Sequence, residues 1–261
     1  MLAEPKPPTQ PLRESNDVLR DGPALRGEAG AQGCLFFRGL VRTEALALRG
    51  HVLEVGRRFG WVPEHAAPME AIAQPGIRLG AYDDRWVAFQ QEVLPLPEFA
   101  ALGHHPVILD VLANLFGEPV KTDRGNTCRI MSPDTPEFTT PPHQDHYYVR
   151  GSTELWTVWL PLVSCPAEQG GLAVLPGSHK WGLLPHAGDG PGRQGTTVSH
   201  DSVWATADYA CGDALMFHCL TVHRALDNVT ADRLRVSVDY RYQPSSHPGA
   251  EDVLNRMTVT S

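Results

Sequence analysis

The sequence predicts a mainly β protein with flanking helices, in which the strands close into a jelly-roll barrel. After Val120, short strand-like runs are separated by glycine, proline and asparagine, without the strand–helix alternation of a parallel sheet. Before that point, apolar residues recur at helical spacing. Between Leu234 and Tyr242, apolar and polar residues alternate, which fits a barrel strand with one packed face and one face lining a cavity.

Length and composition fit one soluble domain with a small-molecule partner. The 261 residues are 42% hydrophobic and 20% charged, which suffices for one large core. A net charge of −8 argues against nucleic acid or an anionic membrane as the partner. We identify no uninterrupted apolar stretch of the length that a bilayer requires. Five widely spaced cysteines and an N-terminus unlike a signal peptide predict a cytoplasmic protein with reduced thiols.

The N-terminal part predicts a tail, a strand and three helices. The proline-rich residues 1–15 are expected to be a flexible tail, and residues 16–261 a single domain whose barrel core spans about 120–243. Residues 34–40 predict a short strand. The apolar spacing from Leu48 to Phe59 predicts a helix that stops at Gly60.

Residues 61–97 contain several prolines and are expected to be irregular. Two short helices follow, because proline favours the first helical turn and glycine the end of a helix. The sequence places the first helix between Pro97 and Gly103, and the second between Pro106 and Gly117.

The barrel region predicts four clear strands and, outside them, a short stretch that carries a pair of metal-ligand residues. The four strands are expected near residues 126–131, 155–162, 213–219 and 235–242. In addition, His143 and Asp145 would point the same way if residues 143–145 were extended. His223, 80 residues downstream, is the candidate third ligand. Two histidines and one carboxylate on one face of an octahedron leave three positions open, as in non-haem Fe(II) oxygenases.

Two further residues bear on this interpretation. His218 precedes His223 by an odd spacing, so in a continuous strand the two would face opposite ways. Arg235 opens the last strand on its polar face. A guanidinium inside a cavity needs an anion, and a carboxylate matches its planar fork. Arg233, on the same face, is the alternative anchor.

The ordered motifs resemble the phytanoyl-CoA dioxygenase family of Fe(II)/2-oxoglutarate oxygenases, which includes ectoine hydroxylase. The likeness covers roughly residues 120–243 and rests on these stretches: His143-Gln144-Asp145, 156–162, 169–172, 175–180, Gly212-Asp213 and Arg235. It implies a double-stranded β-helix, a cupin-like jelly roll. It also implies Fe(II) held by His143, Asp145 and His223, and 2-oxoglutarate bound by Arg235.

The resemblance further implies that 2-oxoglutarate and O2 are consumed, succinate and CO2 are released, and a C–H bond of a small molecule is oxidised. Hydroxylation is the expected outcome, because related halogenases carry a small residue where Asp145 stands. The side chains expected at the cosubstrate are Thr157, Trp159, Asn126 and Ser237.

Two alternative functions stay open from the sequence. One is a cupin-like metal enzyme that works without 2-oxoglutarate; such sites use more histidines and need no counterpart of Arg235. The other is a non-catalytic member of the family that retains the barrel for binding, which would be marked by loss of a metal ligand.

Overall fold

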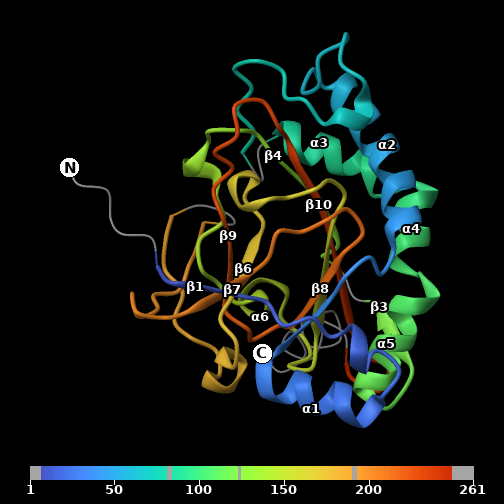
Figure 1. The fold of residues 1–261 in the computed structure, drawn as a ribbon, viewed down its shortest axis with the longest axis vertical. Helices are drawn as coiled ribbons and strands as arrows, with labels where there is room; N and C mark the ends of the chain where they lie inside the picture. The colour runs from blue at the N-terminus through green and yellow to red at the C-terminus, as the bar shows by residue number, and fades with distance from the viewer. Residues whose placement is uncertain (1–6, 81–83, 123–124, 190–192, 249–261) are drawn as a thin grey trace, which may run out of the picture.

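A computed structural model of the protein describes residues 7–80, 84–122, 125–189 and 193–248. Its strands form two sheets that sit together at the centre of the molecule (Figure 1). The smaller sheet has the order β1-β7-β6-β9. The larger has the order β2-β8-β5-β10-β3, and β4 also pairs with β10. The expected mainly β fold with flanking helices, a double-stranded β-helix, is confirmed.

The bounds of the strands are as follows. The smaller sheet contains β1 (Thr9–Pro11), β6 (Leu172–Val174), β7 (Trp204–Thr206) and β9 (His223–Ala225). The larger sheet contains β2 (Cys34–Phe37), β3 (Val120–Thr122), β4 (Thr127–Met131), β5 (Trp156–Pro161), β8 (Ala214–His218) and β10 (Arg235–Pro244).

Most helices gather along one side of the sheets (Figure 1). They are α1 (Gly22–Gln32), α2 (Arg42–Arg58), α3 (Asp84–Val93), α4 (Pro97–Gly103), α5 (Pro106–Phe116) and the five-residue α6 (Asp145–Val149). The predicted limits of α4 and α5 are confirmed. Both helices start on a proline, and α5 is followed by the left-handed Gly117.

Strand β10 connects the helical layer to the interior of the barrel. All ten of its residues are buried, and it pairs with β3, β4 and β5. On its apolar face, Tyr240 donates a hydrogen bond to Phe99 O, and Tyr242 donates one to Gly103 O. A Cβ at Gly103 would lie 2.7 Å from the Tyr240 ring, so glycine allows this close packing. The opposite, polar face of β10 is therefore left to line the cavity, as the alternation predicts.

Three expectations about the N-terminal half are wrong. Residues 9–11, expected in a flexible tail, form β1, which runs parallel to β7, and Leu12 is buried. The barrel extends beyond residues 120–243, because β2 pairs with β8 at the edge of the larger sheet. Residues 84–93, expected to be irregular, form α3, which packs on β4.

One segment, Pro97–Phe116, meets the length and composition of a membrane span, although the sequence analysis identified none. It consists of two helices, α4 and α5, that meet at His104 and His105. Their buried faces pack on α2 and β10 within the protein. This arrangement is that of core helices with apolar faces.

Candidate metal centre and cosubstrate cavity

Two backbone segments that are far apart in sequence bring the candidate ligands together. His143 and His223 form an antiparallel bridge, with N–O distances of 2.9 and 3.0 Å in the two directions. Gln144 continues the extended backbone, but Asp145 begins α6. The expectation of one strand through residues 143–145 is therefore wrong at Asp145. The carboxylate still faces His143, because it stands at the first residue of the helix.

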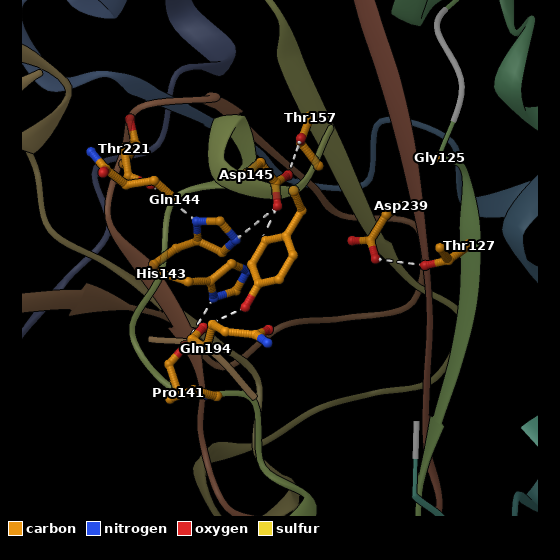
Figure 2. Close-up of polar contacts among 12 residues, drawn as sticks. Gly125, Thr127, Pro141, His143, Gln144, Asp145, Thr157, Gln194, Thr221 and Asp239 are labelled. Carbon is orange, nitrogen blue, oxygen red and sulfur yellow. Dashed lines mark hydrogen bonds and ion pairs between the residues drawn. The ribbon is translucent and has the colours of Figure 1, made fainter. Parts of the chain in front are cut away.

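The three side chains converge on one point, and Figure 2 shows the His143 ring beside the Asp145 carboxylate. Asp145 Oδ1 lies 3.6 Å from His143 Nε2 and 3.6 Å from His223 Nε2. The three ligand atoms all lie within 4.8 Å of one another, and all three residues are buried. Among the described residues, this is the group of histidine and carboxylate atoms that could hold a metal ion.

The backbone fixes which nitrogen of each histidine faces the centre. His143 Nδ1 lies 2.8 Å from Pro141 O, and His223 Nδ1 lies 3.0 Å from Thr221 O. A carbonyl can only accept a hydrogen bond, so each Nδ1 carries the proton and each Nε2 keeps a lone pair. Burial, and then the neighbouring His143, lower the pKa of His223 to about 3, which keeps its imidazole neutral.

The second oxygen of Asp145 has partners of its own. Oδ2 accepts hydrogen bonds from Thr157 Oγ1 and, at 3.3 Å, from Arg241 Nη2. Burial of Asp145 disfavours its charge. The Arg241 guanidinium and the two histidines outweigh burial and hold the pKa of Asp145 well below its usual value. The site therefore presents one anionic carboxylate oxygen and two imidazole nitrogens to a cation.

Arg235 occupies the place expected of a carboxylate anchor. Its side chain is 1% exposed and lines the same cavity as the three ligands. Nη1 donates to Gly170 O at 3.2 Å, whereas Nε has no hydrogen-bond partner among the described residues. Burial lowers the pKa of Arg235 to about 10, so it remains charged at neutral pH. The alternative, Arg233, is exposed and bonds Glu70 O, so it lies outside the cavity.

Two of the other expected cosubstrate residues are also buried with idle polar atoms. Trp159 lines the cavity, and its Nε1 has no partner among the described residues. Ser237 Oγ, on the same face of β10 as Arg235, is likewise buried without a partner. Buried polar groups are normally satisfied, so the idle Trp159 nitrogen at the cavity is available to a ligand, whereas Ser237 is not among the lining residues.

The structure gives Thr157 and Asn126 different positions from those expected. Thr157 bonds Asp145 and does not line the cavity. Asn126 lines a separate cavity beside α4, and its Oδ1 accepts from the backbone N–H of Arg241. Asn126 therefore supports β10 from behind, and its side chain does not reach the cosubstrate cavity.

Among the charged residues that line the cavity, sequence reasoning missed Arg129. The lining residues are Arg129, Thr140, His143, Asp145, Trp159, Leu172, His223, Ala225, Arg235, Asp239 and Arg241. Asp239 Oδ2 accepts from Thr127 Oγ1 at 3.1 Å, as Figure 2 shows. The same oxygen accepts from Arg129 Nε at 2.9 Å. The alternation of β10 places Asp239 and Arg241 inward. Arg129 comes from β4, whose register with β10 is a tertiary property.

A jelly-roll barrel that joins two histidines and one carboxylate beside a buried arginine defines the class of non-haem iron oxygenases. The family model for phytanoyl-CoA dioxygenase (PhyH) matches residues 85–236. The chain belongs to the phytanoyl-CoA dioxygenase family. It is an oxidoreductase of the 2-oxoglutarate-dependent non-haem iron dioxygenases.

Two relatives match along most of their length. The chain is 32% identical over 257 residues to 1-deoxypentalenic acid 11-beta-hydroxylase of Streptomyces arenae, which covers 89% of this chain and 85% of the relative. It is 34% identical over 254 residues to the protein of that name from Streptomyces exfoliatus, with the same coverage.

Solved structures share the fold at lower identity. The epimerase SnoN, in complex with Fe3+, alpha ketoglutarate and nogalamycin RO, has a TM-score of 0.61 at 22% identity, covering 87% of this chain and 84% of SnoN. EvdO2 from Micromonospora carbonacea var. aurantiaca, complexed with 2-oxoglutarate, has a TM-score of 0.60 at 21% identity, covering 87% and 91% of the two chains.

Proposed function

We propose that the chain hydroxylates a C–H bond of a small-molecule carboxylic acid, using Fe(II) held by His143, Asp145 and His223. The observation that carries this proposal is the convergence of two imidazole lone pairs and one carboxylate oxygen on a single buried point. When bound there, iron and 2-oxoglutarate would supply the oxidising power from O2, with release of succinate and CO2. The ligand set leaves three positions for cosubstrate and O2.

Arg235 would bind the far carboxylate of 2-oxoglutarate. Its idle Nε and the idle Trp159 Nε1 are donors, and a carboxylate is an acceptor for both. Ser237 Oγ could complete the same contact from the next inward position of β10. These three atoms support a dicarboxylate cosubstrate over a cupin-like chemistry that uses the metal alone.

Asp145 supports hydroxylation over halogenation. Its Oδ1 fills the coordination position that a halide ion would need, and its Oδ2 is held in place by protein donors. Complete retention of the ligand set also argues against a binding protein that has lost catalysis.

The charge of the cavity supports an anionic substrate. Its lining contains three arginines and two aspartates among the described residues, so it carries one surplus positive charge with neutral histidines. Fe(II) and the 2-oxoglutarate dianion cancel each other, so this surplus remains for the substrate. The two relatives are named for their action on an acid, 1-deoxypentalenic acid. A monocarboxylate would neutralise the cavity.

Aromatic side chains next to the metal ligands would receive the apolar part of such a substrate. The Tyr148 ring lies 5.5 Å from the His143 ring, and Tyr147 stacks on His186 at 4.3 Å. We expect an apolar carboxylic acid as substrate and the cytoplasm as the place of action.

Anaerobic loading with Fe(II) and 2-oxoglutarate should give a weak visible charge-transfer band, and succinate should form when a substrate acid is added with O2. Arg235→Leu should raise the KM for 2-oxoglutarate at least about 30-fold, because loss of a buried charge partner costs about 2 kcal/mol or more. Arg233→Leu is the matched control and should leave this KM within about twofold.

The outcome can contradict each part separately. A band that persists in His143→Ala would refute the ligand assignment. Oxidation indifferent to 2-oxoglutarate would restore the cupin-like alternative. Equal turnover of an acid and its methyl ester would refute the anionic substrate.

A further inference from the structure

We propose that Arg241 is a positioning residue that, with Thr157, holds Asp145 as a one-oxygen metal ligand. The proposal rests on the proposed function, because it concerns the metal held by His143, Asp145 and His223. Its basis is that the two oxygens of the Asp145 carboxylate have different partners. Oδ1 is 3.6 Å from both imidazole nitrogens, whereas Oδ2 is bonded by Thr157 Oγ1 and Arg241 Nη2.

A carboxylate needs such restraint because its last torsion is soft. The terminal torsion of an aspartate is broad and roughly two-fold, so the backbone alone does not choose which oxygen faces the metal. The backbone of Gln144 is well anchored, since its side chain bonds Gly182 O, Leu220 O and Leu184 N. That anchoring places the Asp145 Cα but leaves the carboxylate plane free to turn. Among the described residues, the bonds from Thr157 and Arg241 to Oδ2 hold the carboxylate plane.

Both donors to Oδ2 come from rigid neighbouring strands. Thr157 of β5 and Arg241 of β10 are register partners, so their side chains leave the sheet on the same face. Arg241 has further contacts, including an ion pair of its Nη1 with Asp239 Oδ2 at 3.9 Å. Its Nη1 donates to Gly125 O at 2.8 Å, and its backbone N–H donates to Asn126 Oδ1 at 2.9 Å. Its side chain is 6% exposed. The guanidinium is therefore held in place by protein groups alone.

The chemical consequence concerns the number of open positions. If Asp145 turned and bound through both oxygens, it would occupy a second place on the metal. Two histidines and a one-oxygen carboxylate leave three of six octahedral positions open, whereas a two-oxygen carboxylate leaves two. Bidentate 2-oxoglutarate would then fill the sphere and exclude O2. The Arg241 contact thus preserves the place at which O2 is used.

The alternative role for Arg241 is simple charge compensation of buried Asp145, and a lysine would fulfil that role. A lysine retains the positive charge but lacks the planar fork that reaches Gly125 O and Asp145 Oδ2 together. Thr157→Val removes the other donor with little change in shape or charge. Neither substitution alters the net charge of the cavity. Any effect on the metal site therefore reflects the position of the Asp145 carboxylate and not a lost charge.

The test is titration of the metal-free full chain with Mn(II), using electron paramagnetic resonance for free Mn(II) and water-proton relaxation for waters on bound Mn(II). In Arg241→Lys, the inner-sphere relaxation per bound Mn(II) should fall by about a third, as three waters become two. The affinity of Arg241→Lys for Mn(II) should weaken about 10-fold, the lower end of the range for loss of a residue that supports a metal ligand. Thr157→Val should shift relaxation in the same direction, and Thr157→Ser should restore it.

Arg235→Lys is the matched control. It is the same substitution on the same face of the same strand, at a residue that bonds Gly170 O instead of Asp145. Without 2-oxoglutarate, Arg235→Lys should show the Mn(II) affinity and the water-proton relaxation of the unmodified protein. Circular dichroism of each metal-free variant establishes that it is folded, and if Arg241→Lys does not fold, the Thr157→Val and Thr157→Ser pair decides.

Wild-type relaxation per bound Mn(II) in folded Arg241→Lys would overturn the proposal, since charge alone would then suffice. An equal fall in Arg235→Lys would also overturn it, because the effect would not be specific to Asp145. Failure of the proposed function is seen earlier and separately. The unmodified protein would then show no saturable Mn(II) binding, or binding that survives His143→Ala.

Discussion

Two pairs of neighbouring histidines differ sharply in what they can bind. The rings of His143 and His223 lie 4.1 Å apart, and those of His179 and His218 lie 5.6 Å apart. In the first pair, backbone carbonyls hold the Nδ1 protons, and both Nε2 lone pairs face Asp145. In the second pair, His218 Nδ1 already accepts from Leu220 N at 3.1 Å. Proximity of histidines is therefore insufficient, since the backbone selects the tautomer and a carboxylate supplies the charge.

The charge environment separates the two pairs further. Burial, and then His179 and His146, lower the pKa of His218 to about 4, and no carboxylate of the described residues is among the causes. At the metal centre, Asp145 offsets part of the burial of His223. His218 is thus a neutral structural histidine, in agreement with the sequence interpretation that preferred His223 as the ligand.

The largest effect should come from removing a ligand of the first pair. His223→Ala should weaken Fe(II) binding by more than about 100-fold, beyond the range for a mere supporting partner. Succinate formation should fall with it. His218→Ala, the matched substitution in the second pair, should leave metal affinity within about twofold in anaerobic titrations. A comparable loss of Fe(II) affinity in His218→Ala would contradict the assignment of His223, and not His218, as the ligand.

A second, smaller effect concerns acid stability. Folded His218 remains neutral down to about pH 4, whereas in the unfolded chain it binds a proton below about pH 6.5. The unfolded state therefore binds more protons between these limits, and stability falls as pH decreases. This residue contributes up to about 1.4 kcal/mol per pH unit. Urea unfolding at pH 7, 6 and 5 should show a shallower fall for His218→Gln, and parallel curves would contradict the assignment.

The smallest effect is expected at Thr221, which touches both pairs. Its carbonyl accepts from His223 Nδ1, while its hydroxyl donates to Gly33 O at 2.7 Å, next to His218. Thr221→Val removes the hydroxyl and keeps the carbonyl. We expect a loss of about 1 kcal/mol in the free energy of unfolding, the usual worth of a buried hydrogen bond, with metal affinity unchanged. A weaker metal site in this variant would mean that the two regions are coupled.

Local rules predicted the parts of the fold that local sequence controls. Proline and glycine marked the ends of α4 and α5, and alternation marked the two faces of β10. Helix α3 was missed because prolines nearby suggested an irregular segment, although Phe89 and Val93 stand at helical spacing on its buried face. Strand β1 was missed because three exposed residues carry no pattern, and its pairing depends on β7.

The candidate site could likewise be predicted only where residue type and local spacing determine it. Its ligand residues follow from residue type, spacing and resemblance, and the structure brings His143, Asp145 and His223 together. The contact between Arg241 and Asp145 could not be predicted. The two residues are 96 positions apart in the sequence, and only the packing of the barrel brings them together. Asn126 was placed at the cosubstrate on resemblance alone, and the register of β10 turns it towards the backbone of Arg241.

The bridge between His143 and His223 has a consequence for how the enzyme is supplied with iron. Two main-chain hydrogen bonds close this bridge, and protein donors and carbonyls orient all three ligand groups. The protein's own hydrogen bonds thus orient the ligand groups, and we expect folding not to depend on iron. A chelator should therefore silence the enzyme without unfolding it.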